Sequence, residues 1–208
     1  PILFSAPMVR ANLDDRKTNT RRFLRLPKRF GEISHFGPSD MRGYDWHFRD
    51  GEKRWHDFRH AKLLTLLPWQ VGDRLWVREA WGYDWYDDGN SRAWKRVVYR
   101  ADPGAMALDN GDPAPWRPSI HMPRSASRLT LIVTGVKVER LQDISEEDAI
   151  AEGIEDVTRE VASGDKSLRF WKRYRDGGWN GYVDNPIASY ASLWTEINGP
   201  GSWEANPW

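Results

Sequence analysis

The most concentrated group of reactive side chains lies in residues 14–22, directly after a predicted short helix. This stretch holds one lysine, two threonines and three arginines but no apolar side chain, so burial does not explain its composition. A lysine beside a hydroxyl group, surrounded by guanidinium groups, suits the binding of an anionic or polar substrate and nucleophilic attack on it. The alternative is a solvated basic turn without chemistry.

Two glutamates are candidates to join this stretch. Glu152 falls in the last turn of a helix predicted over 144–154, with Ser145 as its N-cap and Gly153 as its stop. A carboxylate there faces the negative end of the helix dipole, which costs about 0.3 kcal/mol or more. A solvated side chain tolerates this, but a cation from another segment placed against Glu152 explains it better. Glu79 forms either a structural ion pair or part of the same pocket as Lys17.

The elements that position these residues follow from hydrophobic periodicity and turn signals. Residues 2–4 predict a strand, and Ser5 predicts the N-cap of a helix that ends at residues 14–15. Strands are expected over the following ranges: 18–23, 74–78 after a Gly-Asp turn, 94–100 and 127–141, the last with a bulge or tight hairpin at Gly135. Residues 82–93 and 101–118 are expected to be loops, and residues 187–197 a core-facing helix.

A second possible site lies in a helix expected near 55–67. His56 and His60 are four residues apart, which would place both imidazoles on one helical face and suit zinc. Because no third ligand is arranged with them, a solvated helix face is the favoured interpretation. No metal and no cofactor are expected.

Composition narrows the class of protein. The 208 residues suit one domain, and 39% hydrophobic content with 13 tryptophans supports a real core. The net charge of +1 conceals a basic start: residues 1–31 hold eight Lys/Arg and two Asp, hence +6, and the remainder sums to −5. This asymmetry indicates a local anion site. There is no cysteine and no apolar run of membrane-spanning length, so a cytoplasmic protein without membrane attachment is expected.

The chain resembles ASCH domains, a branch of the PUA-like β-barrel superfamily. The resemblance rests on residues 15–22, on residues 72–79, and on the strand at 129–138 with the helix after it. The longer ASCH proteins of phages and prophages are similar over most of the chain, least so in 28–65 and 155–185. The resemblance implies an α+β fold: a PUA-like mixed β-barrel with short flanking helices, formed by a single domain of residues 1–208 with insertions at about 24–70, 82–118 and 155–186.

The resemblance also implies site residues and an activity. In the small bacterial ASCH enzymes that hydrolyse N(4)-acetylcytidine, a threonine is the nucleophile, a lysine the proton acceptor and a glutamate the proton donor; Thr20, Lys17 and Glu152 match them. The residues expected to bind substrate are Arg21, Arg22, Trp76, Arg78 and Glu79. The expected function is a metal-independent amidohydrolase acting on an acylated nucleoside or modified base. The alternatives are a module that binds RNA or a modified nucleotide without catalysis, and an ASCH-type ribonuclease. The expected partner is a nucleoside, a nucleotide or RNA, in the host cytoplasm if a phage encodes the chain; the oligomeric state stays open.

Overall fold

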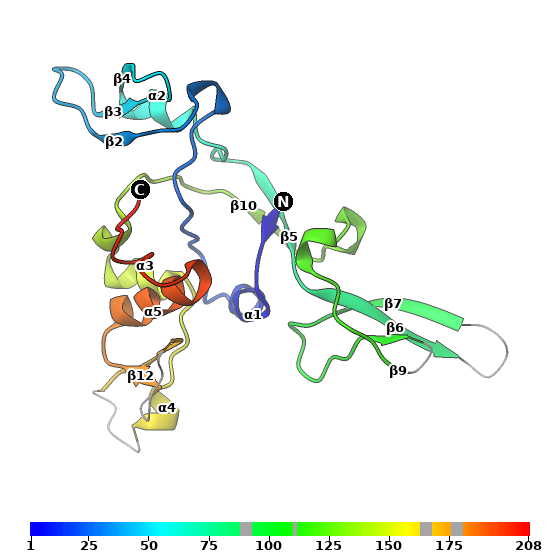
Figure 1. The fold of residues 1–208 in the computed structure, drawn as a ribbon. Coiled ribbons are helices and arrows are strands. Elements are labelled where there is room, and N and C mark those ends of the chain that lie inside the picture. The colour runs from blue at the N-terminus through cyan, green and yellow to red at the C-terminus, as the bar shows by residue number, and fades with distance from the viewer. Residues whose placement is uncertain (88–92, 110–111, 163–167, 176–180) are drawn as a thin grey trace. The chain divides into compact units, whose positions relative to one another are not determined.

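The computed structural model describes residues 1–87, 93–109, 112–162, 168–175 and 181–208, and Figure 1 shows its helices and small sheets. The mixture of helices and strands confirms the α+β class. The chain divides into two compact units. Unit 1 comprises Pro1–Thr20, Arg74–Leu131 and Ser145–Leu193, and unit 2 comprises Arg21–Asp73, Ile132–Ile144 and Trp194–Trp208. The expectation of a single domain with three insertions stays a prediction.

Unit 1 begins with a short three-stranded sheet packed on a helix. Strand β1 (Ile2–Leu3) runs parallel to β5 (Arg74–Arg78), which also pairs with β10 (Thr130–Ile132). Helix α1 (Ala6–Leu13) follows β1, with Ser5 as N-cap and a proline in its first turn, as predicted. The strands and the helix bury a shared cluster of apolar side chains, namely Ile2, Phe4, Val9, Val77 and Ala101.

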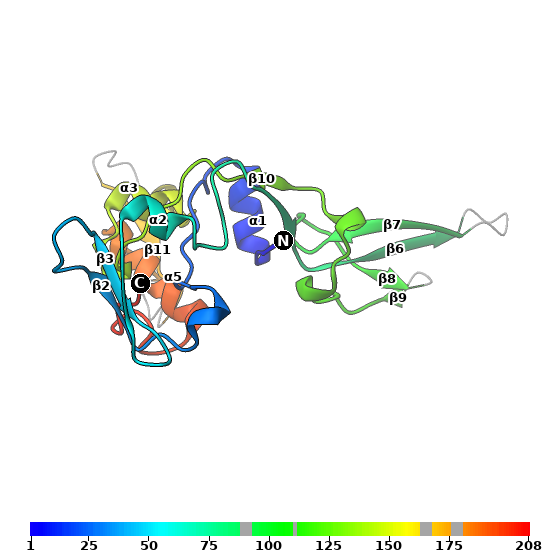
Figure 2. The ribbon, with the colours of Figure 1, turned by 90° about the horizontal axis from the view of Figure 1, so that it is seen from above.

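Two hairpins extend unit 1. Strand β6 (Trp81–Asp87) pairs antiparallel with β7 (Ala93–Tyr99). The prediction of a loop over 82–93 is therefore wrong for residues 82–87 and 93, while residues 88–92 lie outside the described part. Within the expected loop at 101–118, β8 (Leu108–Asp109) pairs with β9 (Asp112–Pro113) and lies beside β6 (Figure 2). The 3₁₀ turns Ser119–His121 and Arg124–Ala126 follow.

The remainder of unit 1 contains the helix whose C-cap is Glu152. Helix α3 (Glu146–Ala151) begins at Ser145, whose hydroxyl oxygen accepts a hydrogen bond from the Asp148 backbone N–H, as the capping signal predicts. After it come α4 (Thr158–Val161), β11 (Trp171–Lys172), β12 (Tyr182–Val183) and α5 (Pro186–Asn198), whose residues from Trp194 onward belong to unit 2. In α5, Tyr190 and Trp194 are buried as predicted, whereas Ile197 is exposed.

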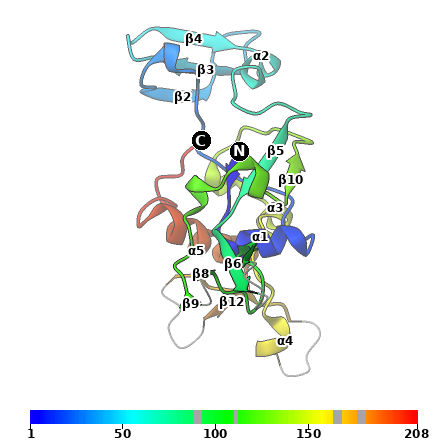
Figure 3. The ribbon, with the colours of Figure 1, turned by 90° about the vertical axis from the view of Figure 1, so that its right-hand side faces the viewer.

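Unit 2 is built on an antiparallel sheet of β2 (His35–Pro38), β3 (Trp46–Arg49) and β4 (Trp55–Phe58), with α2 (His60–Leu64) beside it (Figure 3). A 3₁₀ turn at Lys28–Phe30 precedes the sheet and another lies at Leu141–Asp143. Phe36, Phe48 and Leu63 form its buried core.

The observed β4 and α2 correct the helix expected near 55–67. His56 lies in β4 and His60 opens α2, so no shared helical face exists. His56 Nε2 contacts Asp50 Oδ2 at 2.7 Å, and His60 Nδ1 accepts a hydrogen bond from Trp46 Nε1. Each imidazole is therefore engaged with a different partner, and neither the zinc pair nor the solvated helix face describes them.

Two predicted strands also differ from the structure. Residues 18–23 form no strand, because the backbone N–H groups of Thr18 and Asn19 bind the end of α3 instead of a sheet. Only Thr130–Ile132 of the long strand expected at 127–141 pairs as a strand. Beyond it, the Val133 N–H donates to the Asp73 carbonyl and the Gly72 N–H donates to the Val133 carbonyl. The described strands form separate two- and three-stranded sheets, and the barrel stays a prediction. Among the described residues, no helix has the length and apolarity needed to cross a bilayer.

Candidate functional site

The turn after α1 directs Lys17 toward the end of α3. Asp14 closes α1, and Asp15 adopts a φ of 55°, in the left-handed region that aspartate tolerates better than most residues. The backbone N–H groups of Arg16 and Lys17 then both donate to the Ala11 carbonyl, at 2.8 and 2.9 Å. This reversal of the chain satisfies an orphan carbonyl of α1 and fixes the direction in which residue 17 leaves the helix.

The C-terminal end of α3 receives this turn. Thr18 and Asn19 donate backbone hydrogen bonds of 2.8 and 2.9 Å to the Ala151 carbonyl, and Lys17 and Glu152 form an antiparallel bridge. The Asn19 side-chain amide adds a 2.9 Å bond to Asp148 Oδ1. The exposed carbonyl end of α3 is therefore capped by a segment more than a hundred residues earlier in the chain.

Gly153 makes this close approach possible. Its φ of 85° lies in the left-handed region, and a Cβ added to it would stand 2.8 Å from Lys17 Cβ and 2.9 Å from Ala11 Cβ. Both distances are shorter than real Cβ contacts allow. The glycine therefore ends the helix and also gives the lysine backbone room beside it.

Lys17 and Glu152 form a buried ion pair at the centre of this junction. The Nζ–Oε2 distance is 2.8 Å, and the two side chains are only 1% and 4% exposed. Nζ also donates to the Glu152 carbonyl at 2.8 Å and to the Asn19 carbonyl at 2.7 Å. The expected cation beside Glu152 is present, and its charge offsets the unfavourable position of the carboxylate at the helix end.

Thr20, the predicted nucleophile, follows directly on this junction. It is exposed, one residue after the Asn19 carbonyl that accepts from Lys17 Nζ. The structure thus joins two of the three predicted catalytic residues by a direct hydrogen bond and places the third next in the chain to the lysine's backbone acceptor. Their catalytic roles stay predictions.

Of the two alternatives for Glu79, the structure shows the ion pair. It is 1% exposed, and both of its oxygens accept from Arg128, at 2.9 and 3.0 Å. Arg128 also bonds Asp102 and packs over the Tyr99 ring at 4.0 Å. Nothing in the sequence pattern distinguishes Arg128, since a lone arginine before a strand is common. Only the fold shows that Arg128 compensates the charge of a buried carboxylate.

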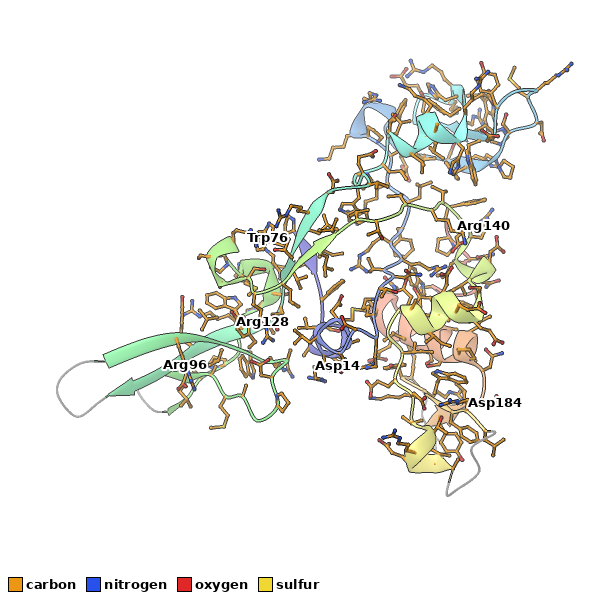
Figure 4. All side chains as sticks on the ribbon, turned by 180° about the vertical axis from the view of Figure 1, so that it is seen from behind. Asp14, Trp76, Arg96, Arg128, Arg140 and Asp184 are labelled. Carbon is orange, nitrogen blue, oxygen red and sulfur yellow. The ribbon has the colours of Figure 1, made fainter. Side chains whose placement is uncertain are left out.

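The predicted substrate-binding residues fall into separate groups. Trp76, on β5 and labelled in Figure 4, has the guanidinium carbons of Arg78 and Arg124 at 4.7 and 5.6 Å from its ring centroid. Arg21 and Arg22 belong to unit 2, where Arg21 forms an ion pair with Glu139 and Arg22 donates to the Arg21 carbonyl.

A polar hollow of about 450 Å³ lies in unit 1, and its lining includes Arg16, the residue before Lys17. It is lined by Arg16, Glu155, Asp156, Val157, Glu160, Lys172 and Gly181. Two of the lining residues form an ion pair, with Lys172 Nζ 3.1 Å from Glu155 Oε1. Burial alone would raise the pKa of the Asp156 carboxyl group, but hydrogen bonds from the Thr158 side chain and backbone N–H lower it below its usual value. Across the described ranges, no three histidine, aspartate or glutamate side chains gather as metal ligands.

Lys17 and Glu152 are among the residues singled out from the sequence, whereas Asn19 was missed as a partner in their junction. Asn19 supplies both a carbonyl acceptor for Lys17 and an amide donor for Asp148, and its only signal was its position within the basic stretch. Comparisons with models of protein families, with curated proteins and with solved structures found no match.

Proposed function

We propose that this protein is a metal-independent amidohydrolase that removes an acyl group from an exocyclic base nitrogen of a nucleoside, a nucleotide or RNA. The observation that carries the proposal is the buried 2.8 Å contact between Lys17 Nζ and Glu152 Oε2, and Lys17 lies three residues before Thr20 in the chain. The proposal includes the PUA-like (ASCH) arrangement for the strands and a cytoplasmic substrate pool.

The direct contact supports the proposal because one proton can move along it. The pair then has two states, ammonium with carboxylate and amine with carboxylic acid. The second state supplies a base and an acid together, which amide hydrolysis requires. The oxygen acceptors around Nζ favour the ammonium form, so in this proposal substrate binding accompanies the transfer to the neutral state.

The proposed reaction has two halves. The Thr20 hydroxyl gives its proton to the Lys17 amine and its oxygen attacks the acyl carbonyl; the C–N bond breaks as the Glu152 acid protonates the leaving nitrogen. Water then attacks the acyl-threonine ester and gives a proton to the Glu152 carboxylate. Lys17 returns its proton to the Thr20 oxygen, which restores the amine–acid pair and releases a carboxylic acid.

The test is incubation of the purified chain with N(4)-acylcytidines and chromatographic detection of cytidine. Thr20→Ala is the decisive variant, because Thr20 is exposed and its loss should leave the fold intact. We expect Thr20→Ala and Lys17→Ala to abolish release and Thr20→Ser to retain part of it. Lys62→Ala, at an exposed lysine of α2, is the matched control and should match the wild type.

Two results would overturn this function. The first is no turnover by the wild type across a broad panel of acylated nucleosides. The second is unchanged turnover in Thr20→Ala, which would remove the threonine from the chemistry. Circular dichroism of Lys17→Ala separates loss of activity from loss of fold.

A second candidate function is RNA or nucleotide binding without catalysis, and the packing of Arg78 and Arg124 on Trp76 favours it. Guanidinium groups held on an aromatic ring offer phosphate contacts beside a surface on which a base can stack. Salt-dependent binding in fluorescence anisotropy, weakened by Arg124→Ala but not by Thr20→Ala, would support it over the enzyme. Absence of affinity for any oligonucleotide would overturn the binding function. The ribonuclease alternative is tested by incubating the same oligonucleotides with the protein and looking for cleavage on a denaturing gel.

A further inference from the structure

The sheet of unit 2 presents two imidazoles with their reactive nitrogens in contact. His35 Nε2 and His47 Nε2 are 3.1 Å apart, and the ring centroids are 5.0 Å apart. His35 is on β2 and His47 on β3, so two separate strands fix the pair. The histidine pair is solvent accessible and lies on the sheet face opposite the buried Phe36 and Phe48. It belongs to unit 2, whereas the Lys17–Glu152 junction belongs to unit 1.

The register of the sheet explains why these two rings meet. Gly37 is the cross-strand partner of His47 and lies two residues after His35, so all three project to one face. A Cβ on Gly37 would lie 3.6 Å from His35 Nε2 and 3.9 Å from His47 Nε2. The absence of a side chain at residue 37 therefore leaves the space over which both imidazoles fold.

Within the described part of the chain, the groups around the rings pack against them, and each Nε2 has the other Nε2 as its hydrogen-bond partner. Trp55, on β4, packs against His35 and His47 with centroid distances of 5.3 and 4.9 Å. Asp57, the cross-strand partner of His47, accepts a hydrogen bond from the Ser39 hydroxyl. The Arg49 guanidinium packs over Trp55 and donates to the Lys53 carbonyl.

We propose that His35 and His47 form a two-histidine site for a divalent transition metal ion, with water completing the coordination. A metal–nitrogen distance of about 2.0–2.1 Å places two ligand nitrogens about 2.9–3.4 Å apart for square or tetrahedral geometry, and the observed 3.1 Å lies inside that range. Imidazole ligands select Cu²⁺, Ni²⁺ and Zn²⁺ over Mg²⁺ and Ca²⁺. Each neutral ring offers its Nε2 lone pair once its proton resides on Nδ1.

Substitutions at His35 and His47 can test the site without disrupting the fold, because both side chains lie on the surface. The experiment is isothermal titration of the full chain, free of any affinity tag, with CuCl₂, NiCl₂ and ZnCl₂ in a non-coordinating buffer. We expect one site per chain, with Cu²⁺ bound most tightly. His35→Ala and His47→Ala should each weaken binding by about tenfold or more, whereas His121→Ala, at an exposed histidine in unit 1, should have no effect.

A third variant keeps both ligands and changes only the space between them. Gly37→Val adds a branched side chain under the two rings, at a strand position that accepts valine, and should part the nitrogens and weaken binding. Electron paramagnetic resonance of the Cu²⁺ form should show two equivalent nitrogen ligands. Absence of binding, binding unchanged in His35→Ala and His47→Ala, or a spectrum without imidazole nitrogens would overturn the proposal.

Discussion

The Lys17 ammonium group has three oxygen acceptors within 2.8 Å, two of them backbone carbonyls. Desolvation of an ammonium and a carboxylate is costly, and only a well-bonded pair recovers that cost. The same contacts that make the pair stable also hold its proton in place. In the free protein, the Lys17–Glu152 ion pair therefore stabilises the junction between the turn after α1 and the end of α3. In our proposal, the pair becomes reactive when a bound substrate favours the neutral amine and carboxylic acid over the charged forms.

A double-mutant cycle measures how much the Lys17–Glu152 ion pair contributes to the free energy of unfolding. Removal of one partner leaves the other charge buried and unpaired, so Lys17→Met or Glu152→Leu alone should lower the free energy of unfolding by about 3–5 kcal/mol. The double variant Lys17→Met/Glu152→Leu should recover part of that loss. The measurement is urea unfolding followed by circular dichroism.

The matched control is the Lys172–Glu155 pair, whose side chains are 42% and 36% exposed. Lys172→Met should cost about 1 kcal/mol or less, because solvent screens a pair at the surface. Strictly additive losses at Lys17 and Glu152 would show that the two side chains do not stabilise each other.

Asp50 supplies a pH dependence of stability. Hydrogen bonds from His56 and, against the effect of burial, from Arg54 hold the pKa of the Asp50 carboxyl well below its usual range. A lowered pKa in the folded state means that the carboxylate stabilises the protein above its unfolded pKa of about 3.9 and loses this effect as pH falls further. The stability gap between wild type and Asp50→Asn should therefore be constant near neutral pH and narrow below about pH 4.

Urea unfolding of both proteins across this pH range measures the gap. Asp40→Asn, at an exposed aspartate of the same unit, is the control and should differ little from the wild type at any pH. A gap that widens toward acid would contradict the assignment, since it would mean that the folded state holds the proton more tightly than the unfolded chain.

At the scale of elements, the end of α3 depends on Gly153. An alanine there would have to adopt the left-handed conformation and would overlap the Lys17 and Ala11 side chains, so Gly153→Ala combines backbone strain with overpacking. We expect a loss of about 2–5 kcal/mol in unfolding free energy. Gly104→Ala is the control: φ is 69° but nothing lies within 4 Å, so only the backbone cost of about 1–2 kcal/mol remains. Equal losses for the two variants would show that the close approach to Lys17 contributes nothing.

The two N-caps give a second comparison between elements. Ser145 accepts a hydrogen bond at the start of α3, whereas Ser5 caps α1 in backbone conformation without a side-chain bond. Ser145→Ala should cost about 1 kcal/mol and Ser5→Ala clearly less, measured by thermal unfolding. A larger effect at Ser5 would contradict the assigned capping.

Local signals account for the elements that the sequence predicted correctly. Ser145, Asp148 and Gly153 carry their own capping chemistry, so α3 and the odd position of Glu152 could be recognised without the fold. The alternation of side chains over residues 18–23 predicted a strand, but alternation does not show which backbone acceptors are near. For Thr18 and Asn19 the acceptor is the Ala151 carbonyl at the end of α3. The histidines in β4 and α2 were misassigned because a Trp- and His-rich segment satisfies strand and helix patterns alike until its cross-strand partners are known.

At the scale of the molecule, the chain maintains separate apolar cores. Unit 1 buries Val9 and Val77, and unit 2 buries Phe48 and Leu63, with no residue common to the two clusters. A substitution that empties one core therefore removes contacts from that core alone, and regions of a protein with different contacts can open with different free energies.

Hydrogen exchange under mild urea tests this separation. Phe48→Ala should cost about 3–5 kcal/mol and speed amide exchange first in β2, β3 and β4, while β1 and β5 keep their wild-type protection. Val77→Ala should produce the opposite pattern, with faster exchange in β1 and β5. Because each substitution is read out on the backbone amides of both units within one molecule, the unaffected unit is the internal control. Uniform loss of protection after either substitution would mean that the two cores unfold as a single cooperative structure, and stability effects at the Lys17–Glu152 junction would then reach every part of the chain.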